Sequence, residues 1–507
     1  MLNFIKIVKN SKACSIVTCS LIWALSVYLI LCSNIIPGVD SYFHLQLAEI
    51  MKNNGLILKD FSWTTCSIWN KAFFDKDWLF HIYLIPFLPF GRLIGGKIAI
   101  LLAVFLSGIT WGCLIKFLKI RYIFITLLLI LLSTQTAFLG RLIFCRGHIL
   151  SILIFPLCLL LMLKNRRVLL LTFTYIYSLA YTGSWQILLI AILFDVVTTR
   201  KSEKFKIINL MSIWCLAGII LGLIVNPYFP ANISGGIIQN IMIIKARWFG
   251  LSQSTILQGQ ELYPMPLYKL FTIFLPLVIV NIYTFIKVLK LKIYDKEKRM
   301  LLFLALLSII YLFITIIMLK FTDYYVPLSI IFIAFYWHNR IFNLNKFIKF
   351  IFFIILYLLL FLSMYKSIKQ LRHDSYRNKI PYTSASKWLR NNLMDRNATA
   401  MNPKKIIFTS SWDNTPYLFY NLPEFKYLVM LDPYFMYAYS PKIYEKWKNI
   451  SEGRTLNPSL SILNTFKTNI VLVTKDKPRL TKQLLNSNYA KLVYKNNKGE
   501  KIFLLKK

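Results

Sequence analysis

The sequence predicts a polytopic α-helical membrane protein that carries a C-terminal extracytoplasmic α/β domain. Of its 507 residues, 57% are hydrophobic and only 16% are charged, a composition too apolar for a soluble multidomain protein. Apolar runs of about 20 residues, the length needed to cross roughly 30 Å of hydrocarbon, recur as far as residue 364 and then stop. We therefore predict a transmembrane domain over 1–370 and a soluble domain over 371–507.

Basic residues predict how the chain threads the membrane. The formal net charge is +40, but most cations in the first 364 residues lie in short clusters between apolar runs, without a nucleic-acid-binding motif among them. Nucleic acid is therefore not an expected partner. Positive clusters favour the cytoplasmic side, so we expect these there: Lys6/Lys9/Lys12, Lys116/Lys119/Arg121, Lys164/Arg166/Arg167, Arg200/Lys201/Lys204/Lys206, Lys287 to Arg299, and Arg340/Lys346/Lys349.

A single threading of about eleven spans satisfies all of these clusters, with the N-terminus inside and the C-terminal domain outside. The proline-broken segment 78–92 is predicted to be interfacial or re-entrant. The spans are predicted at 13–36, 96–115, 121–138, 148–163, 167–183, 186–198, 207–226, 267–288, 300–319, 324–337 and 347–364.

Acidic residues mark the first outside loop, 37–77, as a functional region. The chain has 20 Asp and Glu residues, and none lies between Trp78 and Phe194. Carboxylates at a membrane are costly, so each is a functional candidate. Five of them fall within this loop: Asp40, Glu49, Asp60, Asp75 and Asp77.

The stretch "DSYFHLQLAEIMKNNG", 40–55, predicts a helix in this loop. Asp40 and His44 share one helical face, and Gly55 fits a C-cap. "DWLFH" repeats the spacing with Asp77 and His81. The simpler interpretation of the first pair is that Asp40 only stabilises the helix N-terminus as a capping residue.

The threading brings further polar residues to the same membrane face. "GRLIFCRGHILS" contributes Arg141, Arg146 and His148, and "LKFTDYYVP" contributes Lys320 and Asp323. Carboxylates for a base or a metal, imidazoles, and cations for a phosphate then share one surface. The alternative for each cation is an ordinary snorkelling side chain at a helix end.

The C-terminal region alternates strand-like and helical patterns, which predicts a small α/β sheet. Trp412 and Asp413 lie at a strand-to-helix junction, and Asp432 lies among aromatic residues. They predict either an acceptor-binding surface or an aromatic core with capping aspartates. None of the eight cysteines lies here, so the domain cannot depend on disulfides. The strands are predicted at 405–409, 426–431, 469–474, 491–494 and 501–505.

In their order along the chain, these motifs resemble the GT-C superfamily of membrane glycosyltransferases. That superfamily includes protein O-mannosyltransferases, the lipid A aminoarabinose transferase and the catalytic subunit of oligosaccharyltransferase. The resemblance covers most of the chain and is strongest to uncharacterised bacterial members. It is carried by "DSYFHLQLA", "DKDWLFH", "RGHILS", "KFTDYYVP", "WDNTPYLFY" and "LDPYFMYAYSPKIYEKW".

The resemblance implies inverting transfer of a sugar from a polyprenyl phosphate donor to a hydroxyl acceptor on a lipid, glycan or protein. Asp40 would act as general base or metal ligand. Arg141, Arg146 and Lys320 would bind the donor phosphate. The implied substrate-binding residues are His148, Asp323, Tyr324, Trp412, Asp413 and Asp432.

Two departures from the family pattern matter. Gly147 and His148 replace the more usual Pro and Asp, and the Trp-Trp-Asp signature of oligosaccharyltransferases is absent from the sequence, which argues against protein N-glycosylation. A divalent ion such as Mn²⁺, Mg²⁺ or Zn²⁺ remains an option. Its predicted ligands are Asp40, His44, Asp77 and His81.

Other classes share this architecture. A lipid-linked oligosaccharide flippase, polymerase or ligase, or a non-catalytic scaffold, stays open as an alternative. A transporter would bury its ionisable residues mid-span, whereas here they cluster at one face, which favours chemistry at the membrane surface. The expected location is a bacterial inner membrane, although an endoplasmic reticulum orientation would give the same sequence pattern.

Overall fold

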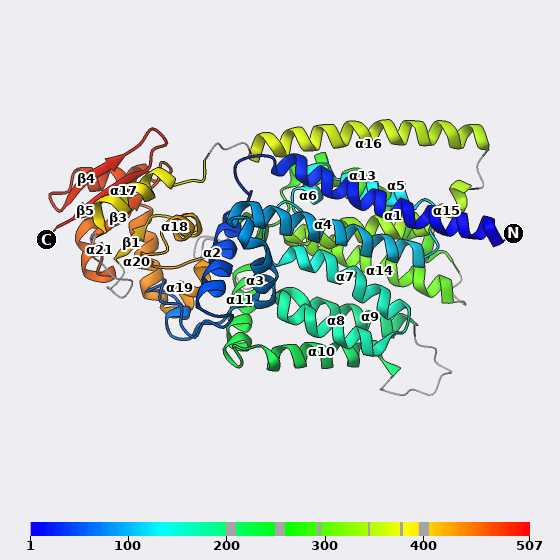
Figure 1. Cartoon of the computed structure of the whole chain (residues 1–507), viewed down its shortest axis with the longest axis horizontal. Helices are drawn as coiled ribbons and strands as arrows, with labels where there is room; N and C mark the ends of the chain where they lie inside the picture. Colours follow the sequence, from blue (N-terminus) through cyan, green and yellow to red (C-terminus); the bar gives the residue numbers. More distant parts are fainter. Residues whose placement is uncertain are drawn as a thin grey trace.

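The computed structural model describes residues 2–198, 209–248, 259–291, 296–342, 345–375, 379–394 and 405–506. The molecule is elongated, with a bundle of roughly parallel helices at the N-terminal end and a small α/β domain at the C-terminal end (Figure 1). Short helices of the first loop lie between the two parts (Figure 1).

Every predicted span coincides with a helix. They are α1 (Leu2–Leu31), α4 (Arg92–Phe117), α5 (Ile123–Leu132), α7 (His148–Leu163), α8 (Arg167–Ala180), α9 (Gln186–Thr198), α10 (Met211–Val225), α13 (Leu275–Leu289), α14 (Lys296–Ile317), α15 (Thr322–Phe342) and α16 (Lys346–Ser375). The predicted domain boundary near residue 370 falls inside the last turns of α16.

Fewer than eleven helices qualify as membrane spans when only the length and composition of each helix are considered. In the described ranges, five helical segments are long and apolar enough to cross a membrane: Lys12–Leu31, Arg92–Phe117, Leu267–Leu289, Glu297–Ile317 and Lys346–Ser375. The ten residues of α5 rise only about 15 Å, half of a hydrocarbon core. The structure therefore establishes the apolar helices, but it does not establish that about eleven of them span the membrane.

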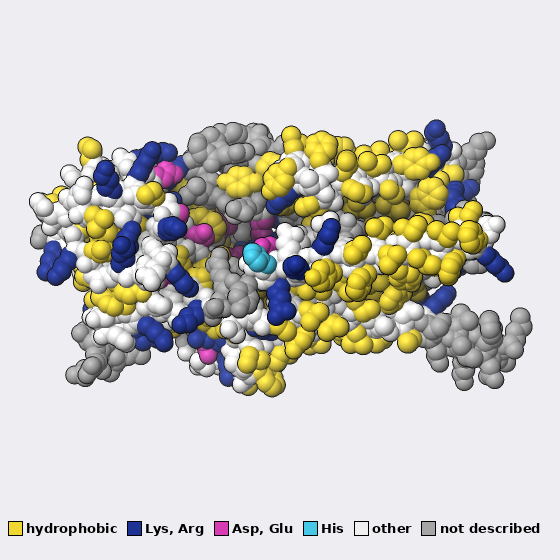
Figure 2. All heavy atoms as spheres, turned by 90° about the horizontal axis from the view of Figure 1, so that it is seen from above, with side chains coloured by type: hydrophobic (Ala, Val, Ile, Leu, Met, Phe, Trp, Pro, Cys, Tyr) yellow, Lys and Arg dark blue, Asp and Glu magenta, His cyan; other side chains and the backbone are white. Residues whose placement is uncertain are grey.

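The helical bundle presents an apolar surface. Figure 2 shows hydrophobic side chains over most of its visible face, whereas lysines and arginines are spread over the C-terminal domain. On α16, Phe347, Phe350 and Phe361 are each more than 60% exposed. Exposed apolar area of this extent is stable in contact with lipid rather than with water.

The first loop folds largely as predicted. It contains α2 (Val39–Asn54) and η1 (Ile68–Asn70), and the segment 78–92 that follows it forms α3 (Trp78–Leu84) and η2 (Ile85–Phe90). Gly55 caps α2 with φ 104°, as expected. The N-cap, however, is Gly38 at φ 85°, where an added Cβ would lie 2.9 Å from the Phe144 ring. Asp40 lies in the first helical turn and makes no capping hydrogen bond, so its side chain is free for another role.

This loop shares a hydrophobic core with the C-terminal domain. Phe43 and Trp69 belong to the same buried cluster as Phe419 and Phe435. Backbone N–H groups of residues 65 and 66 donate 2.9 and 2.8 Å hydrogen bonds to carbonyls of residues 427 and 428, next to the sheet edge. The loop and the C-terminal domain therefore form one packed unit at one end of the helical bundle.

The small C-terminal sheet is confirmed. Its strands are β1 (Ile406–Thr409), β2 (Lys426–Tyr427), β3 (Ile470–Val473), β4 (Ala490–Lys495) and β5 (Lys501–Leu505), in the order β2-β1-β3-β5-β4. β1 is parallel to β2 and β3, and β5 is antiparallel to β3 and β4. All four residues of β3 are buried, as expected of a central strand covered on both faces.

The predicted strand at 426–431 is wrong beyond its first two residues. Leu431 has φ 61°, a left-handed conformation that ends an extended strand. The helices around the sheet are α17 (Thr383–Leu393), η8 (Trp412–Asn414), α18 (Thr415–Asn421), α19 (Pro433–Tyr439), α20 (Pro441–Ser451), α21 (Pro458–Phe466) and α22 (Pro478–Leu485).

Candidate functional site

A polar cavity of about 130 Å³ lies where the first loop, the helical bundle and the C-terminal domain meet. α2 supplies Asp40 and His44, the loop before α7 supplies Arg141 and Arg146, and the C-terminal domain supplies Asp432. The predicted convergence of the first loop with the "RGH" segment is therefore present in the fold.

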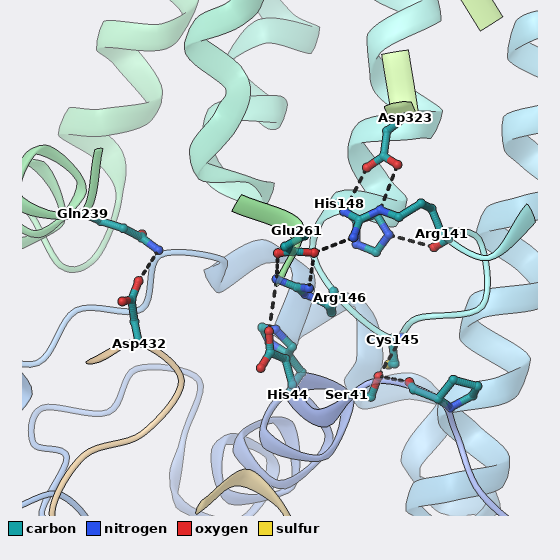
Figure 3. A network of polar contacts seen from close by, with 12 residues as sticks. Ser41, His44, Arg141, Cys145, Arg146, His148, Gln239, Glu261, Asp323 and Asp432 are labelled. Atoms are coloured by element: carbon teal, nitrogen blue, oxygen red, sulfur yellow. Dashed lines mark hydrogen bonds and ion pairs between the residues drawn. The ribbon is translucent and has the colours of Figure 1, made fainter. Parts of the chain in front are cut away.

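Glu261 is the centre of an ion network in this cavity. It lies in η5 (Gln260–Leu262), and both of its oxygens accept 3.0 Å hydrogen bonds from Arg146. Arg141 donates to Glu261 at 2.5 Å (Figure 3). Burial by itself would raise the pKa of Glu261, yet Arg146 and Arg141 hold that pKa well below its usual range. Glu261 is thus a permanent counter-ion for two arginines.

Asp40 is linked to the same network. Its Oδ2 lies 3.1 Å from Nη2 of Arg146, and both side chains remain about one quarter exposed. Asp40 is therefore held by a charge and still accessible to a substrate in the cavity.

Arg141 also binds Asp323, through bonds of 2.9 Å from Nε and 3.1 Å from Nη2. Asp323 is buried, and neither it nor Tyr324 lines the polar cavity. The Tyr324 hydroxyl instead meets Ser151 at 2.5 Å inside the bundle. Of these two predicted substrate-binding residues, Asp323 can act on a ligand in the polar cavity through Arg141, and Tyr324 contacts other residues of the bundle.

A chain of three buried side chains leads into the cavity. Asp75 Oδ2 lies 2.6 Å from Nδ1 of His81, and Nε2 of His81 lies 2.8 Å from Nδ1 of His44. With a carboxylate at Asp75, His81 donates from Nδ1 and accepts at Nε2, so His44 donates from Nδ1. Nε2 of a neutral His44 is then an acceptor. Burial first, then His81 and Arg146, hold the pKa of His44 well below its usual value, which keeps this ring neutral.

The other first-loop acid, Asp77, lies against Gly147. An added Cβ at Gly147 would approach Oδ1 of Asp77 to 3.1 Å, and this buried oxygen has no hydrogen-bond partner among the described residues. Burial raises the pKa of Asp77, with Lys76 acting in the opposite direction. His148, the residue after Gly147, lines the cavity, and its Nε2 lies 2.8 Å from the carbonyl oxygen of Arg141.

Two lysines add positive charge to the cavity. Lys320, in η7 (Leu319–Phe321), and Lys76 both line it, and neither forms an ion pair within the described part of the chain. The ammonium group of Lys320 lies 5.4 Å from the Phe321 ring centroid. Burial lowers the pKa of Lys320 to about 8. An anion in this cavity would meet two cations that have no carboxylate of their own.

A second, larger cavity of about 640 Å³ lies beside the first. Its lining includes Arg141, Glu261 and Lys320, which also line the polar cavity. Most of the remaining lining is apolar and comes from the end of α1, the turn before α7, η6 (Leu270–Phe274) and α16, including Ile36, Ile143, Ile273 and Leu371. The two cavities thus place an apolar chamber directly beside a cationic one.

The C-terminal domain covers the polar cavity. Trp412 and Asp432 line it, whereas Asp413 is exposed and does not. Asp432 caps α19 by accepting from the N–H of Tyr434 at 3.0 Å, and it accepts a 2.9 Å bond from Gln239 of α11 (Ala231–Trp248) (Figure 3). Asp432 therefore both caps α19 and lines the cavity.

Two of the four predicted metal ligands, His81 and Asp40, are engaged with other groups. Both ring nitrogens of His81 are in hydrogen bonds, to Asp75 and to His44, and Asp40 is paired with Arg146. In the part of the chain that the structure describes, no group of three potential ligands converges. Because no three ligands converge there, we derive no chemical step through an ion.

Sequence reasoning missed three residues of this site: Glu261, Asp75 as the partner of His81, and Lys76. Glu261 was detectable, because it is the only acid between Glu203 and Asp295 and lies in an outside loop of the predicted threading. The role of Asp75 was not detectable, since helical spacing pairs His81 with Asp77 instead.

The fold is similar to the folds of solved GT-C membrane glycosyltransferases. The chain is similar to the oligosaccharyltransferase AglB of Archaeoglobus fulgidus solved with an inhibitory peptide and dolichol phosphate, with 12% identity, a TM-score of 0.61 and coverage of 97% of this chain and 74% of that one. A complex of the Archaeoglobus fulgidus oligosaccharyltransferase with zinc and sulfate has 14% identity, a TM-score of 0.61, and coverage of 96% and 73%.

ArnT of Cupriavidus metallidurans bound to undecaprenyl phosphate is also similar, with 11% identity, a TM-score of 0.53, and coverage of 97% of both chains. No protein-family model matches the chain, and no curated protein sequence matches it. The likeness to the solved structures confirms the helical fold expected from the sequence motifs, without establishing the number of spans.

Proposed function

We propose that the protein transfers a sugar from a polyprenyl-phosphate-linked donor to a hydroxyl acceptor at the outer face of a bacterial inner membrane. One observation carries the proposal: the apolar chamber between the helices and the cationic cavity beneath the C-terminal domain share Arg141, Glu261 and Lys320. A ligand with a hydrocarbon chain and a phosphate needs both environments side by side.

The two parts of the donor, its isoprenoid chain and its phosphate, would occupy different cavities. Its isoprenoid chain would occupy the apolar chamber, which opens among the membrane helices. Its phosphate would lie at the boundary, where Lys320 has no carboxylate partner among the described residues and Arg146 and Arg141 are close. Dolichol phosphate and undecaprenyl phosphate in the similar solved structures belong to this ligand class.

The proposed reaction needs few protein groups. The acceptor hydroxyl oxygen attacks the anomeric carbon while Asp40 takes its proton. The bond between the anomeric carbon and the phosphate oxygen breaks, so polyprenyl phosphate leaves and the configuration inverts. Lys320, Arg141 and Arg146 stabilise the negative charge that grows on the leaving phosphate. A phosphate that draws Arg146 toward itself would weaken the hold of Arg146 on Asp40 at the moment when Asp40 must accept a proton.

The acceptor would enter from the side of the C-terminal domain. Trp412 offers a ring face and Asp432 a carboxylate, the groups that bind sugar rings and hydroxyls. His148 and His44 line the same space. Asp323 would act by positioning Arg141, Tyr324 would support the bundle through Ser151, and Asp413 would meet an acceptor only outside this cavity.

A metal ion is an open component of the proposal. The similar zinc and sulfate complex makes a divalent ion reasonable for this class, but the described side chains would have to rearrange to bind one. Activity after exhaustive chelation, and its recovery with Mn²⁺, Mg²⁺ or Zn²⁺, decides the question.

The test is an assay of purified protein against a panel of polyprenyl phosphate sugars, with loss of donor and appearance of free polyprenyl phosphate as readouts. Turnover that requires an added hydroxyl acceptor supports the proposal. A flippase would move the lipid between leaflets of vesicles without consuming it, and a scaffold would do neither.

A further inference from the structure

The C-terminal domain contains another cavity, of about 680 Å³, whose lining shares no residue with the two cavities described above. Three lysines face it: Lys379, Lys475 and Lys498. Its volume lies within the range of small-molecule sites in proteins, roughly 300 to 1,000 Å³.

The cavity occupies a position in the sheet that commonly binds ligands. Thr474 follows β3, and Ser410 follows the parallel strand β1, with their hydroxyl oxygens 3.4 Å apart. Glu500 comes directly before β5, which pairs with β3. In open α/β sheets, ligands bind in the crevice beyond the carboxyl ends of parallel strands.

The lining of this cavity carries more positive than negative side chains. None of the three lysines forms an ion pair with a described residue. The two carboxylates of the lining are satisfied by neutral donors: Asp476 accepts from the Thr474 hydroxyl, and Glu500 accepts from the N–H of Tyr382 at 3.1 Å. Lysines gathered at one cavity repel one another, and an anion between them removes that repulsion.

The backbone here is held in unusual conformations. Tyr382 has φ 62°, rare for a bulky residue, and its hydroxyl donates a 2.7 Å bond to Asn414. Gly499 has φ 82°, and an added Cβ would lie 2.9 Å from Cβ of Lys475. Gly499 adopts its conformation freely in the turn between β4 and β5, whereas a left-handed non-glycine residue such as Tyr382 is uncommon, and such residues concentrate at ligand sites.

We propose that this cavity binds a phosphate ester carried on a hydroxylated group. The lysines would bind the phosphate, Asp476 and Thr474 the hydroxyls, and the Tyr382 ring an apolar face. Two sources share this chemistry: a soluble phosphorylated sugar and the head group of an anionic phospholipid. Lys379 follows the end of α16 at Ser375 by four residues, so the two residues lie within about 14 Å of each other, and the experiment therefore tests both sources.

Lysine footprinting tests the proposal at the site itself. The full chain in nanodiscs of phosphatidylcholine is acetylated with and without glucose 1-phosphate, and the lysines are quantified by mass spectrometry. Labelling of Lys475 and Lys498 should fall about tenfold at a ligand concentration ten times Kd. Lys482 and Lys491, exposed in the same domain but outside the cavity, are the internal controls and should not change.

A second arm distinguishes the sources. Nanodiscs with phosphatidylglycerol replacing part of the phosphatidylcholine, without soluble phosphate, should protect the same lysines if the ligand is a lipid head group. Protection in either arm, removed by the double substitution Lys379→Gln and Tyr382→Ala, supports the site. Equal labelling of cavity and control lysines in both arms overturns it. Protection should persist in Asp40→Asn, so the result does not depend on sugar transfer.

Discussion

Nη2 of Arg146 lies 3.1 Å from Oδ2 of Asp40 while the same guanidinium binds both oxygens of Glu261. The proposed base therefore shares a cation with a permanent carboxylate counter-ion. Because Glu261 keeps Arg146 in place, a bound phosphate can compete for the second position, now held by Asp40, without leaving an arginine unpaired. In the proposed reaction, donor binding and release of the base would be coupled through Arg146.

Replacing Asp40 with Asn should reduce sugar transfer by about 100-fold or more, because the amide cannot accept the proton of the acceptor hydroxyl. Expression and elution from a size-exclusion column should stay near wild type. Asp60→Asn, an exposed acid in the same loop, is the matched control and should keep full activity. If Asp40→Asn retains most of its activity, Asp40 is not the base.

Glu261→Gln should lower the free energy of unfolding by about 3 kcal/mol, because it leaves two partly buried arginines without their shared carboxylate. Thermal unfolding in detergent measures the change. Glu424→Gln, which removes an ion pair between half-exposed side chains, should cost less than about 1 kcal/mol. Equal shifts for the two variants would mean that Glu261 is not a structural counter-ion.

Stability should fall as the pH is lowered from about 7 to 5, because the pKa of His44 is held well below its unfolded value of about 6.5. In that window the unfolded chain binds a proton that the folded chain does not, so acid favours unfolding. His44→Gln should flatten this slope in thermal melts, whereas replacing the exposed His373 with Gln should leave it unchanged. An unaltered slope in His44→Gln would contradict the neutral, buried ring.

Because of Lys320, donor binding should weaken at alkaline pH. The pKa of Lys320, lowered by burial to about 8, means that the free protein loses this positive charge above that pH. The affinity for polyprenyl phosphate should therefore fall as the pH rises from about 7 to 9, and Lys320→Arg, which stays charged, should bind equally across this range. A wild-type affinity that does not change with pH would remove Lys320 from the phosphate site.

The orientation can be tested with single cysteines in a background lacking the eight native ones. Positions near the site are poor probes, since Ser41 and Thr322 are buried and Gly147 lies against Asp77. Asn54→Cys and Leu456→Cys are exposed and should react with an impermeant maleimide on intact cells. Lys164→Cys, at the opposite end of α7, should react only after lysis. The reverse pattern would overturn the proposed orientation.

The sequence by itself determined the helices and the sheet of this protein. Burying an apolar run in lipid requires a helix, so each predicted span is helical, and the pattern of short apolar segments after residue 400 was enough to locate the five strands. Periodicity also located α2 and its end at Gly55, because both depend on contacts within one turn of the chain.

Only the tertiary structure decided which charges meet. Helical spacing pairs His81 with Asp77, but packing turns the His81 ring toward Asp75 and His44, and Asp77 toward Gly147. Glu261, more than 100 residues from either arginine, closes a network that no local pattern encodes. The physical reason is that an ion pair needs its atoms within about 4 Å, and that separation is fixed by how α2, the loop before α7 and η5 pack together, not by their positions in the sequence.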